Sequence, residues 1–357
     1  MKNTNPVRDI SEIDKNLAVA TSISREGLHF YDAEWEPFQI YGIYKEDGMF
    51  RRMPKAIAEQ VSPGVLALHT NTAGGRVRFV TDSPYVAIKT EYEPGKMPHF
   101  ALTGSAGFDM YTECDGDVRY KGTFTPPFIV SDGYESVLDF TDRCERIITI
   151  NFPLYSSVSK LYIGLKEGAV LKAAPAYRIE KPVVYYGSSI TQGGCASRPG
   201  SSYQSILSRR LDCNYINLGF SGSAKGEDAM VDYIKGLDMS VFVMDYDHNA
   251  PSEEHLRATH SKMFHAIRQA QPDLPIILMP RPKYYLEPAE QERAEIVHNT
   301  YLEAKAKGDP NVYFISGAKL MEKALDEGTV DGCHPTDFGF HSMACAVEEV
   351  LREILKK

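Results

Sequence analysis

The rhythm of apolar residues changes at Lys181-Pro182, and this change constrains the fold more than any other feature of the chain. Up to about Ala176, short runs rich in β-branched and aromatic residues alternate with Pro and Gly clusters, and no long stretch has a helical period. Several short strands at this spacing predict an antiparallel β-sandwich, with a jelly roll as the candidate topology. The clearest runs are 77–81, 85–92, 146–152 and 160–165.

After Pro182, strand-like apolar runs alternate with amphipathic helices. This alternation predicts a parallel sheet with helices on both faces. We therefore predict an N-terminal β-sandwich domain over 1–178, weakly structured over 1–20, and an α/β domain over 179–357. The strand-like runs are 183–186, 240–245, 275–280 and 312–315, and the last helix carries Phe340, Met343, Val347, Leu351 and Ile354 on one face.

Charge and composition narrow the classes of partner. The formal net charge is −9 and the sequence pI is near 5.6, which argues against nucleic acid or an anionic membrane as a partner. The first residues lack the apolar core of a signal peptide, and no apolar run approaches the ~20 residues that span a bilayer. We therefore expect a cytoplasmic protein with free thiols, and the six cysteines contain no C-x-x-C pair typical of zinc knuckles. The oligomeric state is left open, a homo-oligomer being one alternative.

Two short stretches together carry the side chains of an acyl-transfer site. Gly187-Ser188-Ser189 follows an apolar run, and a serine becomes a good nucleophile only when a base takes its proton. Asp331-Gly332-Cys333-His334 supplies such a base, because Asp331 can accept the Nδ1 proton of His334 and fix its tautomer. We predict Ser189 as nucleophile, His334 as base and Asp331 as the orienting carboxylate. The alternatives are an ordinary turn or helix cap at the serines and a surface turn at Asp331.

Gly222 and Asn249 are the predicted oxyanion donors, with the backbone N–H of Ser189 as a third. A glycine lets its N–H approach a substrate closely, and an Asn amide can donate where negative charge develops. Both residues follow strand-like runs, as Ser189 does, and ligands of parallel sheets bind beyond the carboxyl ends of the strands. The alternatives are a loop glycine and an Asx-turn asparagine.

No metal or cofactor is expected. Asp245 and Asp247 could suggest a metal site, but the rest of a ligand set is missing. Cys333 is not expected to be the nucleophile, because its thiol would lie beside its own base. Three other histidines share one predicted helix and are expected to be solvated rather than metal-binding: His255, His260 and His265.

The joint pattern of Gly-x-Ser, a distant Gly, a distant Asn and Asp-x-x-His resembles the SGNH hydrolase superfamily, also called GDSL esterases, from Pro182 to about Leu355. The resemblance implies a flavodoxin-like three-layer α/β/α fold and the catalytic roles named above. Two positions depart from the family pattern, since Ser188 replaces the Asp of Gly-Asp-Ser and Ala250 replaces the Asp that usually follows the Asn. The stretches 107–111, with Met110 for the usual Leu, and 193–200 are similar to the subgroup with an N-terminal GxDLY β-domain.

The resemblance implies a serine esterase, and our leading expectation is the hydrolysis of O-acetyl esters of carbohydrates. The partner would be an acylated small molecule or oligosaccharide, and the lack of a long apolar lid argues against a long-chain lipase. An acyltransferase with the same acyl-enzyme and a catalytically decayed carbohydrate-binding protein are the alternatives. Arg198, Arg281 and Tyr284 lie near predicted strand or loop ends and are candidate substrate contacts, with surface polar residues as the alternative. Trp35 could stack on a sugar or be buried.

Overall fold

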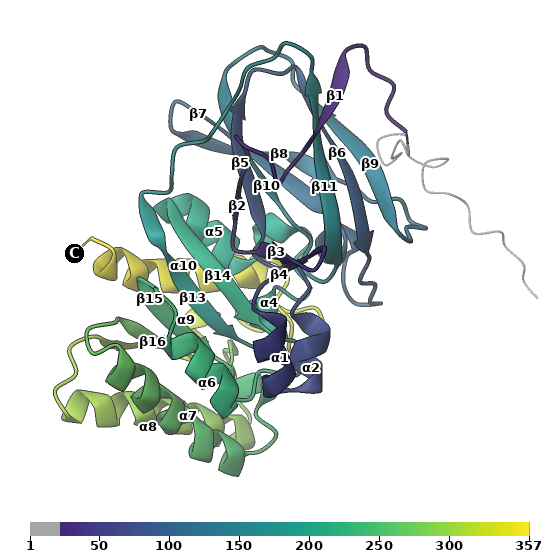
Figure 1. The fold of residues 1–357 in the computed structure, drawn as a ribbon. Coiled ribbons are helices and arrows are strands. Elements are labelled where there is room, and N and C mark those ends of the chain that lie inside the picture. Colours follow the sequence, from purple (N-terminus) through teal and green to yellow (C-terminus); the bar gives the residue numbers. More distant parts are fainter. Residues whose placement is uncertain (1–21, 357) are drawn as a thin grey trace, which may run out of the picture.

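An antiparallel β-sandwich lies against an α/β/α domain in the computed structural model, which describes residues 22–356 (Figure 1). The predicted fold class is therefore confirmed, whereas residues 1–20, predicted to be weakly structured, lie outside the described residues. Within residues 22–356, no helix is both long enough and apolar enough to cross a membrane.

Two facing antiparallel sheets form the sandwich. One has the strand order β1-β11-β6-β9, and the other has β12-β5-β10-β7-β8 with β2 paired to β5. The predicted runs correspond to β5, β6, β10 and β11. The strands are β1 (Leu28–Asp32), β2 (Gln39–Tyr41), β5 (Arg76–Thr81), β6 (Tyr85–Glu93), β7 (Phe108–Cys114), β8 (Asp117–Phe124), β9 (Gly133–Asp139), β10 (Arg146–Asn151), β11 (Ser157–Lys166) and β12 (Leu171–Lys172), with a separate hairpin of β3 (Tyr44–Glu46) and β4 (Met49–Arg51).

The sandwich core is built by alternation along the strands. In β10, Ile148 and Ile150 are fully buried, whereas Ile147 and Thr149 between them are only half-buried. Ile88 of β6 and Ile163 of β11 join the same apolar core from the other sheet. Because successive side chains of a strand point to opposite faces, this alternation places one face of each sheet inside the sandwich.

The C-terminal domain has a five-stranded parallel sheet with the order β14-β13-β15-β16-β17. In chain order this is 2-1-3-4-5, the flavodoxin-like arrangement, whose ligands bind where the strand order reverses. The strands are β13 (Ile179–Gly187), β14 (Cys213–Gly219), β15 (Val241–Asp245), β16 (Ile276–Leu278) and β17 (Val312–Phe314). The helices are α4 (Ser189–Gln192), α5 (Tyr203–Leu211), α6 (Asp228–Lys235), α7 (Glu253–Ala270), α8 (Pro288–Ala306), α9 (Gly317–Leu320) and α10 (Asp337–Ile354).

Strand β13 shows why the run before the serines is continuously apolar. Val183 and Tyr185 belong to the core shared with α5 and α10, whereas Val184 and Tyr186 belong to the core shared with α6, α7 and α8. All four side chains are buried. Because helices cover both faces of this strand, none of its side chains faces solvent, and apolar residues do not alternate with polar ones in its sequence.

Residues 55–68 are helical, although the N-terminal half was predicted to contain only strands. They form two short helices, α1 (Lys55–Val61) and α2 (Pro63–Leu68), and Figure 1 shows both beside α6. Ala58 and Val65 lie in the same apolar core as Phe220 and Met230 of the α/β domain. Helices of this length are too short for a periodic signal in the sequence. The N-terminal half therefore contributes to a helical layer of the C-terminal domain.

His260 of α7 also differs from expectation. It was predicted to be solvated, but its side chain is 1% exposed and its Nδ1 lies 2.8 Å from Thr300 Oγ1 of α8. Burial lowers the pKa of His260 to about 3, so the ring is neutral. The prediction for this residue was wrong because it faces α8 rather than solvent.

Candidate active site

The turn after β13 gives its two serines different roles. A Cβ atom on Gly187 would lie 2.1 Å from Asp245 O and from Thr191 Oγ1, so only glycine fits there. Ser188 is the N-cap of α4, and its Oγ accepts a hydrogen bond from Ile190 N at 3.1 Å. The capping role that sequence reasoning left open thus belongs to Ser188. Ser189 follows as the first residue of α4.

Ser189, His334 and Asp331 form one chain of hydrogen bonds. Ser189 Oγ lies 2.9 Å from His334 Nε2, and His334 Nδ1 lies 2.8 Å from Asp331 Oδ2. The backbone N–H of His334 also donates to Asp331 Oδ1 at 2.8 Å. Val330 N donates to His334 O at 2.9 Å and closes the loop. The loop therefore holds the carboxylate and the imidazole in fixed relation to each other.

Charges around His334 move three pKa values. Burial favours the neutral form of Asp331, but hydrogen bonds from the backbone and ring of His334 outweigh it and lower the pKa of Asp331 to about 2. The Cys333 sulfur lies within 4.8 Å of a His334 ring nitrogen and is the main cause that raises the pKa of His334. Burial acts to lower this pKa, but Asp331 also raises it, and the result is a pKa of about 9. Burial acts to raise the pKa of Cys333, but contacts with His248 and His334 lower it to about 6. Imidazolium and thiolate stabilise each other here.

Gly222 and Asn249 lie on the loops after β14 and β15. Gly222 has φ +67°, in the region that favours glycine, and no atom outside its chain neighbours comes within 4 Å of its virtual Cβ. Asn249 Nδ2 donates to Phe220 O at 2.9 Å, which fixes the side chain and leaves its second amide hydrogen for a ligand. The N–H of Ser189 starts a helix and has no acceptor within it. These three groups could therefore donate to an oxyanion.

Asp245 and Asp247 are held by protein groups. Asp245 accepts a hydrogen bond from Thr191 Oγ1 at 3.0 Å. Asp247 is buried between two arginines, with Arg293 Nε 2.8 Å from its Oδ1 and Arg281 Nε 3.1 Å from its Oδ2. In the described part of the chain, neither carboxylate belongs to a group of three potential metal ligands. Their contacts shape the turn that carries Asn249.

Arg198, a candidate substrate contact, lies between the two domains. Its Nη1 is 3.1 Å from Asp109 Oδ2, the acidic residue of the GxDLY-like stretch, and it also bonds the hydroxyl of Tyr111. Asp109 is fully buried and accepts further hydrogen bonds from Gly200 N at 2.8 Å and Asn151 Nδ2 at 2.7 Å. This network joins β7 of the sandwich to the segment that follows α4.

The other two candidate contacts are placed differently. Arg281 forms ion pairs with Asp247 and Glu290, so its charge is already balanced within the protein. Tyr284 is half-buried against the domain core. A substrate role for Arg198, Arg281 and Tyr284 stays a prediction. Trp35 is 66% exposed, which excludes the alternative that it is buried and leaves stacking on a sugar as a prediction.

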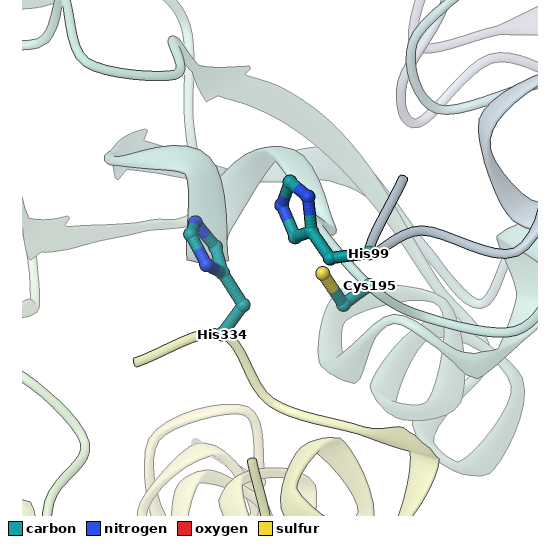
Figure 2. Close-up of side chains that lie close together, drawn as sticks. All are labelled: His99, Cys195 and His334. Atoms are coloured by element: carbon teal, nitrogen blue, oxygen red, sulfur yellow. The ribbon is translucent and has the colours of Figure 1, made fainter. Parts of the chain in front are cut away.

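Residues of the N-terminal domain also lie beside His334 and Ser189, which sequence reasoning missed. His99, in the segment between β6 and α3 (Leu102–Ser105), has its ring centroid 5.4 Å from that of His334. Figure 2 shows His99 and Cys195 beside His334. Tyr155 donates from its hydroxyl to Ser189 O at 3.3 Å. His99 and Tyr155 stand in no motif, and the stretch 193–200 that contains Cys195 does not indicate that this thiol lies near His334, so only the fold reveals these positions.

Two family profiles match consecutive parts of the chain. The GDSL-like lipase/acylhydrolase family matches residues 180–352, and the N-terminus of the SGNH-hydrolase-type esterases, named GxDLY, matches residues 28–171. None of the curated proteins compared with the sequence is similar to it.

Three solved structures are similar over most of their length. A protein described as a GDSL-like lipase from Bacteroides ovatus is 28% identical, covers 92% of this chain and 98% of its own, and has a TM-score of 0.82. A salicylyl-acyltransferase from a tetracycline biosynthetic pathway is 18% identical, with 93% and 98% covered and a TM-score of 0.73. A family two carbohydrate esterase from Cellvibrio japonicus is 12% identical, with 92% and 98% covered and a TM-score of 0.59. The last two show the fold alone. The chain belongs to the SGNH (GDSL-type) hydrolase superfamily, in the subgroup with an N-terminal GxDLY domain.

Proposed function

We propose that this protein is a serine esterase that hydrolyses short-chain acyl esters, with O-acetyl esters of carbohydrates as the preferred class. The observation that carries the proposal is the hydrogen-bonded chain from Ser189 Oγ through His334 to Asp331. It lies at the carboxyl end of β13, where the strand order of the sheet reverses. The likeness of the fold to a carbohydrate esterase supports the choice of substrate class.

The proposed reaction begins when neutral His334 accepts the Ser189 proton at Nε2 and Oγ attacks the ester carbonyl carbon. The carbonyl oxygen becomes an oxyanion, to which the N–H groups of Ser189 and Gly222 and the amide of Asn249 donate. His334 then gives its proton to the departing alcohol, which leaves an acyl-enzyme on Ser189. Water, deprotonated by His334, attacks this ester; the bond from the acyl carbon to Ser189 Oγ then breaks, His334 returns the proton to Oγ, and the acid leaves. Asp331 stabilises the imidazolium in both steps.

The first test separates the two neighbouring serines. Ser189→Ala should remove nearly all turnover and leave the fold intact, whereas Ser188→Ala should retain the nucleophile and lose only a helix cap, worth about 1 kcal/mol. Labelling with a fluorophosphonate should modify the wild type and Ser188→Ala but not Ser189→Ala. A dead Ser188→Ala beside an active Ser189→Ala would show that the nucleophile is misassigned.

The substrate class requires a separate measurement. Acetylated monosaccharides and oligosaccharides should release acetate, and positional analysis of the products should identify the ester that is cleaved. Acetate release from aryl acetates but from none of the acetylated sugars would retain the esterase and overturn the carbohydrate assignment. Absence of a fluorophosphonate adduct at Ser189 would favour the decayed, carbohydrate-binding alternative.

An acyltransferase is the second candidate, because the acyl-enzyme is common to both reactions and one fold neighbour is an acyltransferase. The two differ only in whether water or an acceptor alcohol attacks the acyl group. Product analysis with and without added acceptor alcohols distinguishes them. A new ester formed in preference to free acid would favour the transferase.

A further inference from the structure

Three potential metal ligands from three separate segments meet beside the catalytic serine. His99 comes from the sandwich, Cys195 from the loop after α4, and His334 from the catalytic loop; one ligand atom of each lies within 4.8 Å of the other two (Figure 2). Imidazole nitrogen and cysteine sulfur are ligands that Zn²⁺ prefers. We propose that these residues form an inhibitory site for Zn²⁺, which stops catalysis by binding the imidazole that must act as base. The inference rests on the role of His334 in the proposed function.

The hydrogen bonds of His334 determine which nitrogen would bind the metal. Its Nδ1 lies 2.8 Å from Asp331 Oδ2, so Nε2 is the nitrogen left for a ligand. Nε2 is also the atom 2.9 Å from Ser189 Oγ. A zinc ion on Nε2 would therefore replace the hydrogen bond through which the serine loses its proton. Asp331 would keep its place, since metal-binding histidines usually pair their other nitrogen with a carboxylate or carbonyl.

A second cluster shares His334 but suits a metal less well. It consists of Asp331, Cys333 and His334, also with ligand atoms within 4.8 Å of one another. A metal on that side would have to take Asp331 from His334 Nδ1, and Cys333 Sγ already lies 3.7 Å from His248 Nε2. The cluster with His99 and Cys195 requires loss of only the serine hydrogen bond. We therefore assign the site to Cys195 rather than Cys333.

The surroundings allow an ion to enter and be held. His99 is exposed, His334 is half-buried and Cys195 is 8% exposed, so the site opens at the imidazole of His99 and is closed at the thiol. Binding would replace the S–H bond of Cys195 by a sulfur–zinc bond and release one proton to solvent. With three protein ligands, the fourth position of a tetrahedral zinc ion would hold water.

The inhibition test compares each variant with its own metal-free rate. The chain is treated with EDTA, which should leave activity intact, and Zn²⁺ is then titrated while hydrolysis of a small acetyl ester is followed. We expect inhibition that excess EDTA reverses and that Mg²⁺ does not reproduce. His99→Ala and Cys195→Ser should each raise the inhibitory Zn²⁺ concentration at least about tenfold, the scale of losing an element of a metal site. Cys333→Ser is the matched control and should not raise it.

Cobalt binding gives a readout that does not depend on esterase activity. Co²⁺ bound to a thiolate produces a charge-transfer band in the near ultraviolet, and this band should appear in the wild type and in inactive Ser189→Ala. It should disappear in Cys195→Ser and persist in Cys333→Ser. A band lost only in Cys333→Ser, or zinc inhibition unchanged in both His99→Ala and Cys195→Ser, would overturn the assignment. A cobalt band of the expected pattern in a chain without esterase activity would refute the proposed function and leave the metal site standing.

Discussion

The thiol of Cys333 should set the pH at which the enzyme becomes active. The half-buried sulfur lies beside His248 and His334, which lower its pKa to about 6, and in return it raises the pKa of His334 to about 9. Between these values Cys333 is a thiolate and His334 an imidazolium. A protonated imidazole cannot accept the Ser189 proton, so kcat/KM should rise with pH through the pKa of His334.

The perturbation is Cys333→Ser, which keeps the size of the side chain and removes the ionisable thiol. At pH 7 a base with a pKa of about 9 is neutral in roughly one molecule in a hundred. The first unit by which the substitution lowers the pKa should raise kcat/KM at this pH about tenfold, and the gain per unit shrinks as the pKa approaches 7. The limit is roughly 75-fold, reached if the pKa returned to the free value of about 6.5. Asp331 still favours the imidazolium, so the gain should stay below this limit.

The assay is the pH profile of kcat/KM for a soluble acetyl ester in the presence of EDTA, with Ser189→Ala as the blank for spontaneous hydrolysis. Cys195→Ser is the matched control, because burial raises the pKa of that thiol to about 12 and keeps it neutral across the range. The rising, acid side of the kcat/KM profile should move to lower pH in Cys333→Ser and stay in place in Cys195→Ser. Both variants should reach the same plateau at alkaline pH as the wild type. An unmoved acid side in Cys333→Ser, or the same movement in both variants, would refute the reasoning.

Three further substitutions test other parts of the site. Asn249→Ala should lower kcat about 10²–10³-fold with a small change in KM, because its hydrogen bond forms mainly in the transition state; a large fall in Tm with unchanged kcat would instead show a structural role. Asp331→Asn should preserve the fold, measured by circular dichroism, and impair kcat by favouring the wrong tautomer of the base. Asp109→Asn should lower the free energy of unfolding by about 3 kcal/mol in urea titrations, since it leaves the partly buried Arg198 without its carboxylate; unchanged stability would contradict the bridging role of this pair.

Predictions from the sequence succeeded where a local pattern carries the structure. The buried run 183–186 and the strand–helix alternation after it identified the parallel sheet, because strands and helices leave different periods in a sequence. The order of these strands placed Ser189, Gly222 and Asn249 at one edge, and the structure brings Ser189 to His334.

Other features were invisible because they depend on contacts between distant segments. His260 was predicted to be solvated, and only the packing of α7 on α8 shows that it is buried. Cys333 was considered from the sequence only as a nucleophile, and its effect on the pKa of His334 appears only once the structure places its sulfur near that ring. Arg198 and Arg281 resembled binding residues, yet each has a carboxylate partner from another segment of the chain. A charged residue in a sequence does not reveal what it pairs with.

The N-terminal half is a structural part of the site rather than an appended module. Arg52 is buried and donates from Nη1 to Asn217 O at 3.2 Å and from Nη2 to Leu68 O at 2.7 Å, so it anchors the end of β14 just before the loop that carries Gly222. Asp109 holds the segment after α4 through Arg198, and Tyr155 contacts the carbonyl of Ser189 itself. Because these groups are buried and polar, removing the sandwich would leave their partners unsatisfied, at about 1–3 kcal/mol for each. The α/β domain of this chain therefore depends on the N-terminal domain both for stability and for the placement of Ser189 and of the loop that carries Gly222.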